Sequence, residues 1–384
     1  MFGSLRTYIV SSKSISATPA FEALESALGT AKIAGIRCGI TSHSPWEDVF
    51  QLAQDIQATD ADLIITLGGC SITDAVKLAK LFIPNNVSTI PGAEELFARI
   101  RADESVKPAT IPVINVPTTL SGSEFTCAGG ATNLTTGHKQ VTMHSSLYAD
   151  VVVLDPRLSI STPRQVWLAT GVRAIDHFVE GLYGNVAALF TDMREELGNE
   201  ANEDIEKVIA GALGSLLTSL LSTKENWNDE EARLQAFLAV KECPRAGHNG
   251  IGASHGIGHQ LGPLGVGHGE TSCIILPWVL RYNWQHGDET ARRRLGLAID
   301  TFWGQEKVAE TLGATGLSRK DADLYDVVGA YISALGLPRT LGQFDIKEEQ
   351  LEGLAESAMK DWCTKVNPVT LTKDKVLDIL RNAK

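Results

Sequence analysis

The stretch DLIITLGGCSITDAVKLAK (residues 62–80) passes from an apolar run through two glycines into residues with helical spacing. Such a pattern predicts a buried strand, a tight turn and then a helix. The same alternation recurs upstream in RTYIVSS, FEALESALGTAK, IRCGITS and VFQLAQDIQ, and short β-branched runs follow downstream in IPVINVPTT and ADVVVLDP. Strands that alternate with helices in this way predict a parallel α/β sheet.

The character of the chain changes near Pro163. Beyond it lie long segments of helical period, among them RQVWLATGVRAIDHFVEGLYG and EDIEKVIAGALGSLLTSLL. We therefore expect an α/β domain over residues 1–160 and an all-helical domain over residues 161–384, with Thr162 capping the first long helix ahead of Pro163. A chain of 384 residues is long enough to build two hydrophobic cores.

The balance of 34 basic against 46 acidic residues gives a formal charge of -12, which opposes binding to nucleic acids and to anionic membranes. Six scattered cysteines without a C-x-x-C pair predict neither a disulfide framework nor a thiolate zinc site. The start of the chain lacks the apolar core of a signal peptide, and we expect no apolar run of about 20 residues that could span a bilayer. These features predict a soluble cytoplasmic protein with no nucleic-acid or membrane partner.

The small residues of the turn at 68–71 would let a pyrophosphate approach backbone N–H groups at the positive end of the following helix. A plain structural turn is the alternative. The segment PTTLSGSEFT (residues 117–126) follows a second strand and could form a polar loop against a nicotinamide and its ribose. The candidate nucleotide-binding residues of these two segments are Gly68, Gly69, Ser71, Asp74, Thr118, Thr119, Ser123 and Thr126.

Two later segments, GVRAIDHFVE (residues 171–180) and SHGIGHQLGPLGVGHGE (residues 254–270), hold a set of histidines. His177, His255 and His268 are residue types that bind a divalent metal. Arg173, one helical turn before His177, is a permanent cation that cannot be a ligand. Taken singly, a histidine of this kind is more often a hydrogen-bonded core or surface residue.

Four motifs follow one another in a specific order: strand–GGxSxxDxxK, then PTTxxGSExT, then xAxxHxxE on a helix, then HxxxH with a final HG. This order resembles the iron-containing (group III) alcohol dehydrogenase superfamily, which shares its scaffold with glycerol dehydrogenase and dehydroquinate synthase. The resemblance extends to the C-terminal VNPVTLTKDKVLDILRNA. It implies a Rossmann-like N-terminal domain, a helical C-terminal domain, an active site between them and a homodimer.

The resemblance also implies roles for particular residues. The three histidine metal ligands of the family match His177, His255 and His268. Arg173 stands where the family has an aspartate ligand, and His259 matches a further histidine near the nicotinamide. Lys139 matches a residue that supports the ribose. Ser12 stands where the family usually has an aspartate that selects NAD, so that NADP is allowed as well as NAD. The chain begins at this strand, and we expect its α/β domain to be shorter at the N-terminus than in the family.

The arginine has consequences for a metal. A guanidinium beside a divalent cation opposes its binding, and here it replaces an anion that would have favoured it. We therefore expect no catalytic metal, and an Arg173 that binds a substrate carboxylate or a developing oxyanion. Two alternatives stay open: Arg173 pairs with Asp176 or Glu180, or Asp176 serves as an off-register ligand that preserves a Zn or Fe site.

Within the superfamily, the maleylacetate reductases resemble this chain more closely than the alcohol dehydrogenases proper. Their loop is one residue shorter, as in PTTLSGSE, and their histidine helix carries a Glu-x-Leu-Tyr pattern like Glu180–Tyr183. The resemblance implies an NAD(P)H-dependent reductase of a small oxo or enoyl carboxylic acid, with a proton from His255, His259 or His268. The alternatives are a Zn- or Fe-dependent alcohol dehydrogenase and a non-redox isomerase or lyase on the same scaffold.

Overall fold

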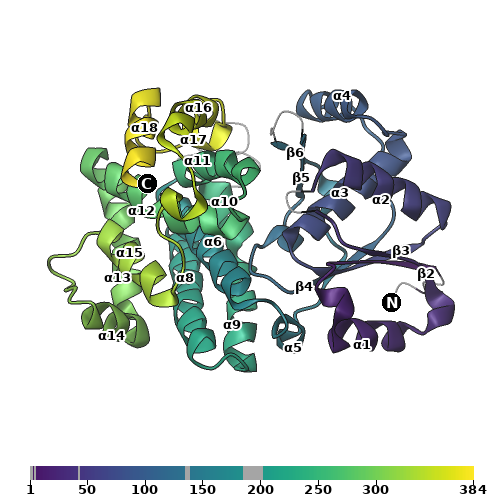
Figure 1. Cartoon of the computed structure of the whole chain (residues 1–384), viewed down its shortest axis with the longest axis horizontal. Helices are drawn as coiled ribbons and strands as arrows, with labels where there is room; N and C mark the ends of the chain where they lie inside the picture. Colours follow the sequence, from purple (N-terminus) through teal and green to yellow (C-terminus); the bar gives the residue numbers. More distant parts are fainter. Residues whose placement is uncertain (1–2, 4–5, 42–43, 135–138, 185–201) are drawn as a thin grey trace. The chain divides into compact units, whose positions relative to one another are not determined.

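Figure 1 shows the computed structural model of the chain, in which residues 3, 6–41, 44–134, 139–184 and 202–384 are described. The chain divides into two compact units, Met1–Thr162 (unit 1) and Pro163–Lys384 (unit 2). Unit 1 contains the strands, and the described residues of unit 2 form helices and connecting loops.

Five parallel strands form the sheet of unit 1, in the order β2-β1-β3-β4-β7. Their bounds are Ile33–Cys38 for β2, Thr7–Ser11 for β1, Leu63–Gly68 for β3, Val113–Pro117 for β4 and Val151–Val152 for β7. The register pairs Ser11 with Leu67 and Gly68 with Pro117. The carboxyl ends of the three central strands therefore meet at one edge, where their following loops lie together.

Helices cover both faces of this sheet, as Figure 1 shows. They are α1 (Pro19–Leu28), α2 (Trp46–Ala58), α3 (Cys70–Asn85) and α4 (Ile90–Arg101). Successive side chains of a strand point to opposite faces, so that Tyr8 and Val10 of β1 are buried in the core formed with α2 and α3, whereas Ile9 joins Phe21 of α1. This two-sided burial explains the continuous apolar runs in the sequence.

Unit 1 also contains an antiparallel hairpin of β5 (Ala128–Thr132) and β6 (Lys139–Met143), and β5 packs against α3. The short helix η3 (Ser123–Phe125) precedes the hairpin, and the one-turn helix α5 (Pro156–Ser159) lies near the end of the unit. The hairpin and η3 bring the predicted second loop against the helix that follows the glycine turn.

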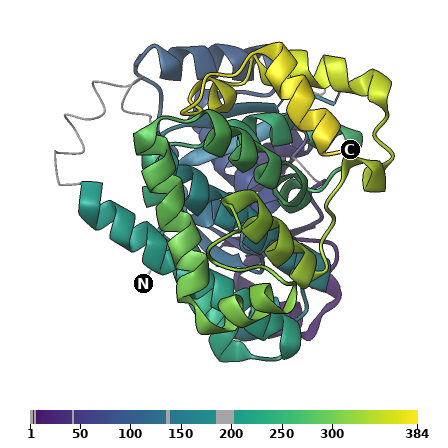
Figure 2. The same cartoon turned by 90° about the vertical axis from the view of Figure 1, so that its left-hand side faces the viewer.

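Unit 2 is built around α6 (Arg164–Tyr183), which is buried along most of its length. The other helices are α8 (Asn202–Glu225), α9 (Glu230–Val240), α10 (Cys243–Asn249), α11 (Ala253–Leu261), α12 (His268–His286), α13 (Glu289–Gly304), α14 (Glu306–Ala314), α15 (Leu324–Leu335), α16 (Glu348–Ala358), α17 (Trp362–Lys365) and α18 (Lys373–Asn382). Helix α6 packs against α8, α10 and α12, and α11 packs against α12, α16 and α17. In Figure 2 the C-terminal helix α18 is drawn in yellow, beside α16, on which it packs.

The predicted fold class, an α/β part followed by an all-helical part, is confirmed. The predicted cap is wrong. Helix α6 begins at Arg164 after Pro163, and no side chain caps its first turn. The hydroxyl of Thr162 instead donates to the carbonyl of Thr118 at 2.7 Å, so Thr162 fixes the loop after β4.

Helix α8 corrects the expectation that no apolar run is long enough to span a bilayer. Its segment Ile205–Glu225 is long and apolar enough to cross a membrane by length and composition alone, although half of the apolar window is buried. The helix packs against α6, α9 and α13. A buried core helix passes the same test, and the packing of α8 is that of a core helix.

Candidate active site

The glycine turn lies where β3 ends and α3 begins. Gly69 is the residue before the helix, and Gly68 has a φ of 158°. A Cβ on Gly69 would lie 3.1 Å from Thr119 Cγ2, and the N–H of Thr118 donates to the carbonyl of Gly68 at 3.1 Å. The two predicted loops are therefore in contact, and the close approach leaves little room for a side chain at the turn.

Ser12 lies next to this turn, because its backbone nitrogen is 3.6 Å from the position of a Cβ on Gly68. Its hydroxyl accepts from the N–H of Ile15 at 3.2 Å and lies 3.2 Å from Ser14 Oγ. Ser71 lies in the first turn of α3, and its carbonyl accepts from Ser44 Oγ at 2.8 Å. The carboxyl edge of the sheet thus carries hydroxyls and glycines, and no acidic side chain stands at position 12.

The remaining predicted nucleotide residues are held together by protein contacts. Ser123 Oγ donates to Asp74 Oδ1 at 2.5 Å, and Lys139 Nζ lies 3.7 Å from Asp74 Oδ2. Lys77 Nζ donates to the carbonyl of Ser123 at 2.5 Å, to Thr126 Oγ1 at 3.1 Å and to the carbonyl of Ala128 at 2.8 Å. Burial lowers the pKa of Lys77, and the carboxylate of Asp74 opposes this shift. Lys77 therefore organises the loop, a role that sequence reasoning missed although it placed Lys77 on the helix.

The histidines of the predicted constellation come together from three helices of unit 2. His177 lies on α6, His255 and His259 on α11, and His268 begins α12. The Nε2 atoms of His177 and His255 are 3.3 Å apart. The rings of His255 and His259 have centroids 6.3 Å apart, and those of His259 and His268 lie 6.5 Å apart and nearly parallel. The i,i+4 spacing on α11 places His255 and His259 on one face.

Glu180 holds His255 from the side away from His177. Its Oε2 lies 2.6 Å from His255 Nδ1 and accepts from the N–H of Gly252 at 2.6 Å, and its Oε1 accepts from the N–H of Ser254 at 2.8 Å. Burial raises the pKa of Glu180 well above its usual value, and the nearby Asp176 adds to the rise. Burial and the charge of Arg173 lower the pKa of His255 well below its usual value. His255 is therefore a neutral imidazole at neutral pH.

Arg173 is 1% exposed. Its Nη1 donates to Ser272 Oγ at 3.1 Å and lies 3.8 Å from Asp176 Oδ2. This arrangement matches the alternative in which Arg173 pairs with Asp176. It does not support a guanidinium that reaches a substrate carboxylate, because the group is buried against its own ion-pair partner.

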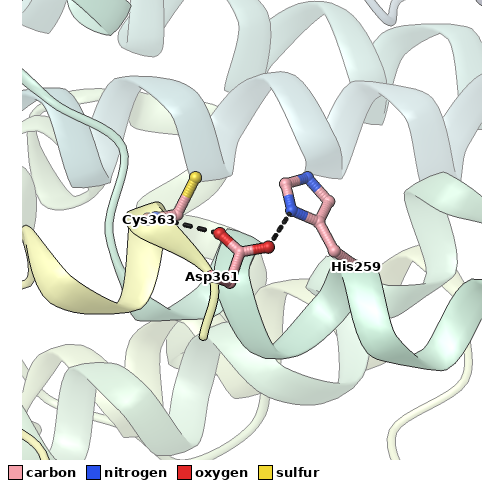
Figure 3. A group of neighbouring side chains, drawn as sticks. All are labelled: His259, Asp361 and Cys363. Carbon is pink, nitrogen blue, oxygen red and sulfur yellow. Dashed lines mark hydrogen bonds and ion pairs between the residues drawn. The ribbon is translucent and has the colours of Figure 1, made fainter. Parts of the chain in front are cut away.

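His259 pairs with a carboxylate that sequence reasoning missed, Asp361, which lies just before α17. Asp361 Oδ2 is 2.9 Å from His259 Nδ1, and its Oδ1 accepts from the N–H of Cys363 at 2.9 Å (Figure 3). Burial pushes the pKa of Asp361 up, but the hydrogen bond and charge of His259 outweigh this and hold the pKa below its usual value. The side chain of His259 is 23% exposed, against 2% for His255, so His259 is the more accessible of the two.

The donor set does not fit a divalent metal. Within the described part of the chain, the donor groups that lie within 4.8 Å of one another are Asp176–Glu180–His255 and His259–Asp361–Cys363, and neither is the predicted set of His177, His255 and His268. In the first group both carboxylates already accept from protein donors, and a guanidinium is adjacent. In the second, burial raises the pKa of the Cys363 thiol, which disfavours the thiolate that binds metals.

The remaining histidines, for which the sequence predicts no catalytic role, lie outside this cluster where they are described. His144 Nδ1 is 2.8 Å from Ser146 Oγ in unit 1, and the ring of His286 lies 4.6 Å from that of Tyr282. His43 and His138 lie outside the described residues, as does the side chain of His248. The acidic segment at 192–206, for which the sequence likewise predicts no catalytic role, falls largely outside the described residues too.

Two family models match the chain in succession. The model of the iron-containing alcohol dehydrogenases matches residues 1–156, and the model of the C-terminal part of the Fe-containing alcohol dehydrogenase family matches residues 167–384. Dehydrogenase FUM7 of Gibberella moniliformis is 54% identical, over 98% of this chain and 90% of that protein. Maleylacetate reductase 1 of Cupriavidus pinatubonensis is 26% identical, over 92% of this chain and 82% of that protein. Among solved structures, the alcohol dehydrogenase from Oenococcus oeni matches with a TM-score of 0.80 at 23% identity, over 100% of this chain and 93% of that one.

Proposed function

Because the chain belongs to the iron-containing alcohol dehydrogenase family, it is an oxidoreductase, and we propose that it reduces a small oxo or enoyl carboxylic acid with NADPH or NADH, without a catalytic metal. The resemblance inferred from the motifs is confirmed, and a maleylacetate reductase is among the relatives. Oxidoreductase membership replaces the isomerase or lyase alternative. Maleylacetate is the proposed test substrate.

Unit 1 supplies the residues that fit a dinucleotide. The turn at Gly68–Gly69 brings backbone close to Thr119 at the start of a helix, which suits a pyrophosphate approaching the positive helix end. The hydroxyl of Ser12 next to this turn does not repel a 2'-phosphate, which supports NADPH beside NADH. When bound, the cofactor supplies the hydride that is added to the electrophilic carbon of the substrate.

The observation that carries the proposal is the pair of His259 and Asp361, because reduction also needs a proton. Burial lowers the pKa of His255 well below its usual value and that of His177 to about 3, and Arg173 adds to both shifts. Both imidazoles are therefore neutral near neutral pH, and a neutral imidazole is too weak an acid to serve as the proton donor. A carboxylate at 2.9 Å stabilises the protonated form of His259, which we assign as the proton donor.

His268 is less suited to this role. It is the first residue of α12, where the positive end of the helix disfavours an imidazolium. Its ring lies nearly parallel to that of His259 with centroids 6.5 Å apart. We therefore propose that His268 lines the site beside the proton donor, and that Arg173 takes no direct part in binding the substrate.

The test of the proposed function is oxidation of NADPH and NADH by chelator-treated protein with maleylacetate, repeated after addition of Zn²⁺ or Fe²⁺. Turnover by the metal-stripped protein would support the proposal. Turnover only after addition of metal would favour a metal-dependent alcohol dehydrogenase, for which the 3.3 Å separation of the His177 and His255 Nε2 atoms is the supporting observation.

Variants then test the proton donor. His259→Gln should lower kcat by about 100-fold, because a general acid contributes at least that much, while KM for NADPH changes little. Asp361→Asn keeps the oxygen that accepts from Cys363 but removes the carboxylate beside His259, and should lower kcat by about 10-fold. His286→Gln, outside the cluster, is the control. Unchanged kcat in both His259→Gln and Asp361→Asn would contradict the assignment.

A further inference from the structure

Arg173 is the residue of the histidine cluster that the proposed reaction does not use. We propose that its guanidinium, paired with Asp176, takes the place of a divalent cation beneath His177 and His255, and that a carboxylate at position 173 would turn the same site into a metal site. The inference rests on the metal-free part of the proposed function. It concerns metal binding, so it can be tested without knowing the substrate.

The position of Arg173 is fixed by three helices. It lies on α6 one turn before His177, and its Nη1 donates to Ser272 Oγ on α12 at 3.1 Å. A Cβ on Gly258 of α11 would lie 3.6 Å from the same Nη1. Helices α6, α11 and α12 also carry the histidines of the cluster. The guanidinium is therefore enclosed by the elements that would have to hold a metal.

Asp176 links the guanidinium to the histidines. Its Oδ2 accepts from Ser272 Oγ at 2.5 Å and from Ser254 Oγ at 2.8 Å, and it lies 3.8 Å from Arg173 Nη1 and 3.5 Å from His255 Nδ1. One carboxylate oxygen thus separates the permanent cation from the imidazole. Asp176 is fully buried, and a buried carboxylate needs a nearby positive charge. Arg173 supplies that charge, as a metal would.

The second oxygen of Asp176 is a candidate ligand for a cation. Its Oδ1 has no hydrogen-bond partner among the described residues, which leaves it open to a cation. A divalent ion at that point would lie next to a guanidinium held by the same carboxylate, however, and the repulsion in a buried site is large.

The two imidazoles already have the spacing that metal ligands need. Two nitrogens bound to one tetrahedral zinc ion at about 2.0 Å lie about 3.3 Å apart, and the Nε2 atoms of His177 and His255 are 3.3 Å apart. What the site lacks is an anionic ligand, and what opposes a metal is the guanidinium. A single substitution at position 173 changes both.

The experiment measures Zn²⁺ binding to the full-length protein and its variants, by equilibrium dialysis and metal analysis after removal of metal with a chelator. Arg173→Asp should bind about one equivalent of Zn²⁺, at least about 100-fold more tightly than the wild type. Arg173→Lys keeps a cation at the same position and should bind as weakly as the wild type. Arg173→Asp combined with His177→Ala should lose the gained site. Visible absorption of bound Co²⁺ would report histidine ligation independently.

Arg173→Asp places two carboxylates side by side, and their repulsion destabilises the metal-free fold. The double variant R173D/D176N, with a single carboxylate, is therefore measured in parallel. The proposal is overturned if a folded R173D or R173D/D176N protein binds no Zn²⁺. It is also overturned if the wild type or Arg173→Lys binds one equivalent of Zn²⁺ tightly and the additional substitution His177→Ala abolishes that binding. Neither result depends on turnover, so inactivity towards maleylacetate would count against the proposed function alone.

Discussion

Glu124 is a carboxyl group that unit 1 buries inside the loop after β4. It is 4% exposed, and its Oε1 has no hydrogen-bond partner among the described residues. Burial raises its pKa from 4.5 to about 7, with a backbone hydrogen bond and Lys77 opposing the rise. The folded state therefore holds the proton more tightly than the unfolded chain, so this group stabilises the fold at low pH, and the contribution is lost as pH rises from 4.5 through 7.

Glu124→Gln should remove this dependence, because glutamine mimics the protonated acid. At pH 8 the variant should exceed the wild type in free energy of unfolding by up to about 3 kcal/mol, whereas at pH 4, below both pKa values, the difference should be near zero. Urea unfolding followed by circular dichroism at both pH values measures it. Glu95→Gln, at an exposed position of α4, is the control. A difference that does not change with pH would contradict a buried, protonated Glu124.

At the residue scale, the sequence identified the chemistry-bearing side chains better than their partners. Arg173 and Asp176 are three residues apart on one helix, so their ion pair was foreseeable as an alternative. Asp361 is 102 residues from His259. No periodicity connects positions so distant, and only the packing of α11 against α17 brings them together.

At the scale of elements, helix α3 offers a comparison between two buried lysines. Lys77 and Lys80 are each 2% exposed. Lys77 donates to several groups in the loop between Ser123 and Ala128, whereas Lys80 donates to the carbonyl of Tyr148 at 3.1 Å. Both contacts tie α3 to its surroundings, but only Lys77 fixes the predicted nucleotide loop.

Lys77→Met should therefore loosen that loop and leave buried acceptors unsatisfied, at a cost of about 2–4 kcal/mol in stability. We expect KM for NADPH to rise by about 10-fold. A loop that Lys77 no longer holds must be ordered when NADPH binds, and each 1.4 kcal/mol that this ordering costs weakens the affinity tenfold. Lys80→Met should leave KM within about twofold. Steady-state kinetics with varied NADPH, together with thermal unfolding, separates the two effects. Equal KM values for the two variants would show that Lys77 does not act through the loop.

The elements that the sequence predicted are those with strong periodicity. The runs that became β1, β3 and β4 are buried on both faces, and continuous apolar residues mark such strands. The hairpin of β5 and β6 was not predicted, because β5 has the sequence AGGAT, and glycines weaken the signal of a strand. The cap at Thr162 failed because a tertiary hydrogen bond to Thr118 uses the hydroxyl that a cap requires.

At the scale of the whole molecule, the chain consists of two compact units whose proposed roles differ, nucleotide binding in unit 1 and proton transfer in unit 2. Each unit has its own buried clusters. Tyr8, Ile64 and Leu78 belong to a cluster of unit 1, and Ile257, Leu351 and Ile379 belong to one of unit 2. The sequence predicted this division from the change in periodicity, because each period reflects how the segment is buried.

Separate cores lead to a prediction about ligand binding. A ligand that binds only the folded state stabilises what it binds by about 2.7 kcal/mol at 100 times its Kd. With NADPH at that concentration, hydrogen exchange in the peptides covering 63–75 and 113–126 should therefore slow by up to about 100-fold. Peptides of α16 and α18, which pack together in the core of unit 2, serve as the internal control and should change little. Unchanged exchange at 63–75 would contradict the assignment of the glycine turn to the nucleotide. Equal slowing in α16 and α18 would instead mean that the two units unfold as one.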